Sequence, residues 1–212
     1  VNQDGRTNGI TAPSGLAQTA VQLEAYARAG VSPATLDYVE AHGTATRLGD
    51  PIEVEALTNT FRRFTPEVGG CALGSVKTNI GHTLAAAGVA GVIKLLLAFR
   101  HRALPPSLHF RRANPYIDFE RGPFRVLTAL SPWERGRTGP RRAAISSFGL
   151  GGSNAHALLE EWPRQERSPP ANTGTLAVPL SARDPEALRR QVDALSAWMG
   201  QHLDDTWMWP DL

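Results

Sequence analysis

The apolar positions of this chain follow two different spacings. Ala20, Leu23 and Ala27 recur at helical spacing, which predicts a helix over residues 16–29 that ends at Gly30. Short apolar runs bounded by glycine, proline or polar residues predict strands instead. Such runs lie at residues 36–41, 73–76, 124–127, 143–147, 155–159 and 176–180.

Two further helices are predicted in the middle of the chain. Asp50 is placed as an N-cap, Pro51 occupies the first helical position, and Glu53 can reach back to close a capping box. These signals predict a helix over residues 50–64. Residues 83–99 are apolar nearly all round, which indicates a helix that is buried on every side.

Strands that alternate with helices indicate an α/β fold with layered helices and largely parallel strand pairing. The composition changes near Trp162, where proline and polar residues predict a linker. We therefore expect a main domain over residues 1–161 and a Pro-rich linker over 162–175. A partial, small α/β subdomain follows over 176–212, with a helix that begins near Asp184 and Pro185 and ends near residue 202.

Composition and charge exclude several classes of protein. A formal net charge of +2 gives no reason to expect a nucleic-acid partner, and the basic residues are nearly all arginine, with Lys77 and Lys94 as the two lysines. The lone Cys71 excludes an internal disulfide framework and a zinc site. With no apolar run approaching the ~20 residues of a membrane span and no signal peptide, we expect a cytoplasmic location and no membrane partner. Neither end resembles a natural terminus, so we expect a longer polypeptide.

Two histidines stand out as candidates for chemistry. His42 and His82 each lie in a turn rich in glycine and threonine, directly after a predicted strand, where ligand sites of α/β sheets gather. A neutral imidazole at the start of a helix can donate a hydrogen bond to a substrate oxygen. The alternative is a turn histidine that only satisfies backbone groups. The glycines of 149–152 leave a similar choice between an anion-binding nest and a tight hairpin.

Four segments resemble the ketosynthase domains of modular polyketide synthases and related fatty-acid condensing enzymes. In order, they are VNQDGRTNGITAPSG, YVEAHGTATRLGDPIEVEAL, LGSVKTNIGHTLAAAGVAGVIK and SSFGLGGSNAH. With the connecting LPPSLHF and ANPYIDFE, the resemblance covers about residues 1–161. It implies the C-terminal half of a thiolase-like fold, in which two similar α/β halves form a layered body and two subunits pair. Residues 176–212 resemble the start of the linker subdomain that follows ketosynthases.

The resemblance also implies a reaction and its partners. A β-ketoacyl synthase, an acyltransferase, takes an acyl chain onto a cysteine. It then joins that chain to a malonyl unit on the phosphopantetheine arm of an acyl carrier protein, with loss of carbon dioxide. The chain itself is expected to bind no cofactor and no metal. Its expected partners are the acyl carrier protein, the N-terminal ketosynthase half and a second subunit in a homodimer.

Site residues follow from the resemblance position by position. His42 and His82 match the two catalytic histidines, whose N–H groups would stabilise the enolate left by decarboxylation. Lys77 matches the motif lysine, as an organiser of the surroundings of the second histidine. The remaining matches are Thr44 and Thr46 at the pantetheine arm, the Leu150 amide beside Gly149 in the oxyanion hole, and Phe148 as the gate of the acyl pocket.

The chain departs from the family pattern in three places. Ala45 stands where the family usually has glycine, a change we expect to be tolerated, and Leu150 stands where many members have phenylalanine or isoleucine. The nucleophilic cysteine of the family lies in a Cys-Ser-Ser segment that this chain does not contain. Cys71 matches no nucleophile position and is expected to be a buried structural thiol. The isolated chain should therefore not condense.

Two alternatives to a condensing enzyme remain at this point. One is a ketosynthase segment that only holds chains or dimerises, a state usually marked by loss of the first histidine, which is present here as His42. The other is thiolase-like chemistry without decarboxylation. Geometry offers a test: the imidazoles of His42 and His82 should lie within roughly 6 Å, twice hydrogen-bond range. The glycine turn should form a third wall, and His101, His109, His156 and His202 should lie elsewhere.

Overall fold

The computed structural model describes residues 1–5, 13–133, 139–162 and 178–201. It divides into two compact units, Val1–Trp162 and Pro163–Leu212. In the second unit the described part holds one helix, α5 (Pro185–Gln201), whose start is capped by Asp184. Residues 178–180 of the expected strand are not in a strand, and 176–177 lie outside the described residues, as does nearly all of the predicted linker.

A six-stranded mixed sheet forms the centre of the first unit. The inner strands are parallel, with β2 between β7 and β3, and β3 beside β5. β7 and β8 form the predicted antiparallel hairpin around the glycine turn, and β1 pairs antiparallel with β8. The order across the sheet is β1 (Asn2–Gln3), β8 (Ser153–Glu160), β7 (Arg142–Phe148), β2 (Tyr38–Glu40), β3 (Cys71–Gly74) and β5 (Phe124–Val126). β4 (Ala103–Leu104) and β6 (Ser131–Pro132) form a separate pair.

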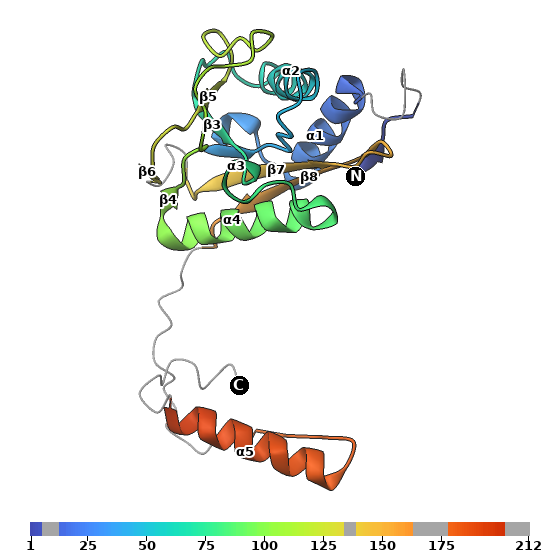
Figure 1. Cartoon of the computed structure of the whole chain (residues 1–212), viewed down its shortest axis with the longest axis vertical. Coiled ribbons are helices and arrows are strands. Elements are labelled where there is room, and N and C mark those ends of the chain that lie inside the picture. Colours follow the sequence, from blue (N-terminus) through green and yellow to red (C-terminus); the bar gives the residue numbers. More distant parts are fainter. Residues whose placement is uncertain (6–12, 134–138, 163–177, 202–212) are drawn as a thin grey trace. The chain divides into compact units, whose positions relative to one another are not determined.

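Helices cover both faces of the sheet, so the unit is a layered α-β-α body (Figure 1). α1 (Gly15–Ala29) and α2 (Gly49–Phe61) pack on one face, and α4 (Ala87–His101) packs on the other. Successive strand residues point to opposite faces, because side chains alternate along a strand. Val39 therefore joins the core under α1 and α2, while Tyr38 joins the core under α4. The predicted fold class is confirmed.

Three short helical turns lie between these elements: η1 (Pro33–Thr35), α3 (Lys77–Ile80) and η2 (Leu84–Ala86). α3 and η2 flank the His82 loop. The predicted end of α1 is confirmed, since Gly30 adopts the left-handed conformation with φ 63° and closes the helix.

The predicted start of α2 is wrong. The helix begins at Gly49, and its N-cap, Leu48, makes no side-chain capping bond. Instead, Asp50 accepts from the backbone N–H of Ala45, and Glu53 turns into the interior. Capping residues are present in the sequence, but both carboxylates accept hydrogen bonds from backbone N–H groups of the loop before the helix instead of capping the helix.

The expectation of a helix buried on all sides over residues 83–99 is also wrong. The segment opens with η2, and α4 buries only the face toward the sheet. On its outer face, exposed fractions run from 47% to 63% at four apolar residues, Val89, Ile93, Leu96 and Leu97. By length and composition, the 18 residues Leu84–His101 would also suit a membrane span. Packing of one face on the sheet is what the structure shows for this helix.

Candidate functional site

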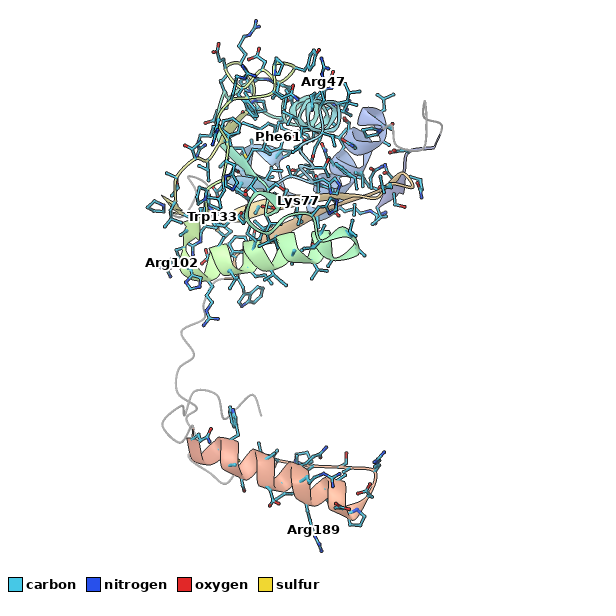
Figure 2. The ribbon with its side chains drawn as sticks, in the orientation of Figure 1. Arg47, Phe61, Lys77, Arg102, Trp133 and Arg189 are labelled. Atoms are coloured by element: carbon cyan, nitrogen blue, oxygen red, sulfur yellow. The ribbon has the colours of Figure 1, made fainter. Side chains whose placement is uncertain are left out.

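The candidate site lies where three parallel strands end. β2, β3 and β7 are neighbours that run in the same direction, so their carboxyl ends share one edge of the sheet. His42 follows β2 by two residues, Lys77 opens α3 after β3, and Phe148 is the last residue of β7. Lys77 is labelled on α3 in Figure 2. Strand order, which sequence cannot show, brings these segments together.

The two histidines predicted to act together are neighbours. The ring centroids of His42 and His82 lie 5.6 Å apart with the rings nearly perpendicular, and Phe148 approaches His42 with its ring centroid at 5.4 Å. This separation is within the roughly 6 Å expected for two imidazoles that serve one oxygen atom. The predicted closeness of the two imidazoles is confirmed, although only His82 of the pair lines the cavity described below. The catalytic roles of these residues stay predictions.

A buried carboxylate holds the backbone of the His42 segment. Glu53, on α2, accepts hydrogen bonds from the backbone N–H groups of His42 at 2.7 Å and Gly43 at 2.9 Å. Gly43 has φ 51°, and a Cβ there would lie 2.9 Å from the Cβ of Ser75, so the turn requires glycine. Sequence reasoning assigned Glu53 to a cap. Its spacing of eleven residues from His42 carried no signal of this contact.

Burial controls protonation at this edge. Desolvation first, then the nearby charges of Lys77 and His82, lower the pKa of His42 to about 4, so its imidazole is neutral at pH 7. Burial raises the pKa of Glu53 to about 7, against the two backbone bonds that favour its charged form. Burial also lowers the pKa of the Lys77 ammonium, despite the acidic groups around it. Neutral imidazole is the form that keeps one N–H donor and one acceptor nitrogen.

The hydrogen bonding of His82 fixes which nitrogen carries its proton. The backbone N–H of Leu84 donates to Nδ1 of His82 at 3.0 Å, so in the neutral ring the proton is on Nε2. His82 precedes η2, and α4 begins only at Ala87. The continuous helical segment Leu84–His101 thus begins two residues after His82, close to the expected position of this histidine at the N-terminus of a long helix, and a local backbone bond orients its ring.

A cavity of about 620 Å³ opens beside the histidine pair. Thr44, Thr46, Lys77 and His82 all line it, which places both candidate pantetheine threonines in one hollow with the second histidine. The Thr46 hydroxyl also accepts from the backbone N–H of Gly49 at 3.0 Å, which fixes its orientation. Further along, the same lining is basic, with His109, Arg111 and Arg112.

The remaining histidines occupy varied places. His109 lines the cavity, so its expected position outside the cluster is wrong; the loop after β4 carries it there. His156 is buried, with Nδ1 3.0 Å from the Ser146 hydroxyl, while His101 ends α4 and His202 lies outside the described residues. Across the described ranges, no group of three or more His, Cys, Asp or Glu side chains is placed to hold a metal ion.

The glycine turn contributes less to the cavity than expected. Phe148 meets His42, but residues 149–152 are not in the cavity lining, because the turn projects beyond the end of the hairpin. The N–H of Gly149 donates to the carbonyl of Ser153 and the N–H of Gly152 donates to the carbonyl of Gly149, whereas the amide of Leu150 donates to no other group that the structure describes. The Leu150 side chain is 80% exposed. An amide free to donate is what an oxyanion hole requires.

Cys71 lies at the start of β3, away from the edge that bears the histidines. It is 3% exposed, and burial raises the pKa of its thiol well above the usual range. A thiol that cannot ionise is a poor nucleophile. The expectation of a buried structural thiol is confirmed.

Comparison with protein families gives two matches that together span nearly the whole chain. Residues 1–111 match the model described as "Beta-ketoacyl synthase, C-terminal domain", and residues 113–207 match the "Ketoacyl-synthetase C-terminal extension". The two matches meet inside the first compact unit, which continues to Trp162.

Curated relatives are large multienzymes of which this chain matches a small part. It is 45% identical to polyketide synthase PksL of Bacillus subtilis over 96% of the chain and 4% of PksL. It is 49% identical to erythronolide synthase EryA3 of Saccharopolyspora erythraea, over 92% of the chain and 6% of that protein. With PikAIII of Streptomyces venezuelae the identity is 48%, over 96% of the chain and 13% of the relative.

Solved structures similar to this chain include ketosynthases. The ketosynthase from module 6 of the bacillaene synthase of Bacillus subtilis superposes with a TM-score of 0.75 at 44% identity, over 96% of this chain and 34% of that one. An oxazolomycin ketosynthase domain of Streptomyces albus, OzmH KS7, gives a TM-score of 0.73 at 45% identity, over 90% and 33%. The chain thus spans about a third of each solved ketosynthase, and the thiolase-like fold is shown.

Proposed function

Because the chain belongs to the β-ketoacyl synthase family, in which it is the C-terminal part of a ketosynthase domain, we propose that it supplies the condensing half of a polyketide synthase active site. The observation that carries the proposal is the pairing of His42 and His82 at 5.6 Å between ring centroids, on the edge of a cavity that holds Thr44, Thr46 and Lys77. A neutral imidazole, that of His42, in contact with a second imidazole, that of His82, which lines the cavity, suits a reaction that develops negative charge on an oxygen atom.

The reaction proceeds in two steps. An acyl chain first moves onto the thiolate of an upstream cysteine that this chain lacks. A malonyl thioester then loses carbon dioxide, and the electron pair of the broken C–C bond forms an enolate whose oxygen accepts from the Nε2–H of His82 and from His42. The enolate carbon attacks the acyl thioester, and collapse of the tetrahedral intermediate releases the cysteine thiolate.

Other site residues support this chemistry. The free amide of Leu150 is one donor for the tetrahedral oxyanion, and Gly149 lets the turn present it, while Phe148 packs on His42 where the acyl pocket would open. Lys77, half-buried beside His42, adds a positive charge that favours neutral imidazole.

The cavity also fits the expected carrier. The hydroxyls of Thr44 and Thr46 suit the amide groups of a phosphopantetheine arm, and Arg111 and Arg112 on the same lining suit its phosphate. Phosphopantetheine would arrive on an acyl carrier protein, and the proposed reaction needs no cofactor bound to this chain. A cytoplasmic location, a homodimeric synthase and the acyltransferase class complete the proposal.

The test uses the complete ketosynthase domain that contains this chain. His42→Ala and His82→Ala should each lower the rate of condensation by 10²-fold or more, since each removes a donor to the enolate. Self-acylation of the upstream cysteine, followed with a radiolabelled acyl thioester, should stay near the parent rate. Equal loss of acylation and condensation would show that the histidines are structural. The isolated chain should give no β-ketoacyl product, and turnover that depends on Cys71 would contradict the assignment.

A further inference from the structure

A second buried carboxylate, outside the histidine cavity, contacts three elements at once. Glu40 is the last residue of β2 and is 1% exposed. Its Oε2 accepts from the Lys94 ammonium of α4 at 2.7 Å and from the Tyr38 hydroxyl at 2.9 Å. Its Oε1 accepts from the backbone N–H of Val76, the residue that begins the α3 turn.

This arrangement uses one residue for two different purposes. The ion pair with Lys94 is buried on both sides, with side-chain exposures of 8% and 2%, so the ammonium compensates the charge of Glu40 in the interior. Lys94 also donates to the Tyr38 hydroxyl at 2.7 Å, which completes a closed set of partners. The charge is therefore already satisfied without Val76. The bond to Val76 must be explained by what it does to the backbone.

Val76 anchors the turn that carries Lys77 and leads to His82. Its carbonyl accepts from the N–H groups of Asn79 and Ile80, while its own N–H donates to Glu40. Because the turn is a single four-residue helix, it has few bonds of its own to hold its position. Glu40, the last residue of β2, lies two residues before His42. One carboxylate thus ties the backbone of the His82 segment to the strand that presents His42.

We propose that Glu40 is a positioning residue for condensation, which sets the spacing of the two histidines by accepting the Val76 N–H, while Lys94 serves to keep Glu40 buried and charged. The inference rests on the proposed function of the histidine pair. It predicts that loss of this single hydrogen bond moves the α3 turn and slows the step that needs both imidazoles. Acyl transfer to the cysteine does not need them and should be spared.

The sharpest test removes the donor and leaves the ion pair intact. Val76 has φ −58°, close to the −65° that proline requires, so Val76→Pro deletes the N–H at a compatible backbone angle. Val76→Ala is the matched control, because it loses the side chain but keeps the N–H. In the complete ketosynthase, Val76→Pro should lower kcat for condensation at least tenfold relative to Val76→Ala, with self-acylation rates of the two variants within about twofold.

A second pair of variants tests the acceptor side without leaving a buried charge. Glu40→Leu with Lys94→Met removes both charges and the acceptor, whereas Glu40→Gln with Lys94→Met removes both charges and keeps an acceptor oxygen. Condensation should be at least tenfold slower in the leucine variant than in the glutamine variant. Arg141→Met, which breaks the ion pair with Glu161 at the far end of the hairpin, controls for general loss of stability.

The outcomes separate cleanly. Selective loss of condensation in Val76→Pro and in the leucine variant supports the inference, provided that Arg141→Met lowers acylation and condensation equally. Equal condensation by Val76→Pro and Val76→Ala, or parallel loss of both half-reactions in the leucine variant, would overturn it. If His42→Ala and His82→Ala themselves fail to separate the half-reactions, the proposed function fails instead.

Discussion

The two faces of the sheet are covered to different degrees. Under α1 and α2, large side chains such as Tyr26, Leu57 and Phe61 are at most 2% exposed, and the exposed positions of α2 are polar. On the opposite face, α4 buries Leu95 and Ala98 against the sheet but leaves a row of apolar residues on its outer side. Within this chain, α2 presents polar residues to solvent on one side of the sheet, whereas α4 presents apolar residues to solvent on the other.

The apolar residues on the outer side of α4 explain why its sequence predicts a helix that is buried on all sides. A helix that faces solvent needs one apolar face, whereas a helix between two layers needs two. This chain covers about a third of the solved ketosynthases, and the family resemblance implies a layered body of two similar halves. We expect the N-terminal ketosynthase half to cover the outer face of α4.

The largest effect should follow from a charge on that outer face. Leu97→Asp, at a position 47% exposed here, should abolish association with a separately expressed N-terminal half, since the carboxylate would be buried without a partner. Pull-down of the two halves measures this. Leu16→Asp on α1, where the parent leucine is 87% exposed, is the matched control and should still associate. Undiminished association of the Leu97 variant would mean that the two faces do not differ as described.

On the side of the sheet covered by α1 and α2, the buried His156 should make the stability of the chain depend on pH. Its ring lies between the hydroxyls of Ser146 and Tyr26, and burial lowers its pKa to about 4. The unfolded chain binds this proton near pH 6.5, so stability is fully present above that pH and is lost as the pH falls toward 4. His42 acts in the same direction. Glu53, with its pKa raised to about 7, acts oppositely, because its contribution is lost as pH rises.

Replacement of His156 measures how much this residue contributes to the pH dependence of the unfolding free energy. Between pH 7 and pH 5, His156 alone should cost about 2 kcal/mol of unfolding free energy. His156→Gln should therefore flatten the stability profile of the isolated chain by about that amount, as measured by urea denaturation at each pH. His101→Gln, at an exposed position at the end of α4, should leave the curve of unfolding free energy against pH parallel to that of the parent chain. Parallel profiles for both variants would show that burial at His156 does not control its protonation.

The sequence predicted where residues at the ends of strands lie. It did not predict the hydrogen bonds that side chains form with segments distant in sequence. The strand ends that carry His42 and His82 were readable, and their convergence required only that the strands be parallel neighbours. The roles of Glu53 and Glu40 were not readable. Both accept backbone N–H groups supplied by other segments, and no local pattern distinguishes such a carboxylate from a helix cap or a strand-end charge.

Ala45 shows the same limit at the level of backbone angles. The sequence marks it only as alanine in a glycine position, next to the threonines of the cavity. In the structure it has φ 58°, in the left-handed region, where its Cβ is strained, and its N–H donates to Asp50. Tolerance of this alanine therefore includes a cost that sequence alone could not assign.

The smallest predicted effect follows from relieving that strain. A left-handed alanine costs roughly 1–2 kcal/mol, and the added freedom of glycine in the unfolded chain offsets about 0.4–1 kcal/mol of the relief. Ala45→Gly should thus stabilise the isolated chain by up to about 1.5 kcal/mol, and each 1 kcal/mol should raise Tm by roughly 2–4 °C. Ala27→Gly, at an exposed position in α1, should instead lose about 0.5–1 kcal/mol, because its backbone is already relaxed. The opposite signs are the test: a lower Tm for both variants would mean that the site edge stores no strain at Ala45.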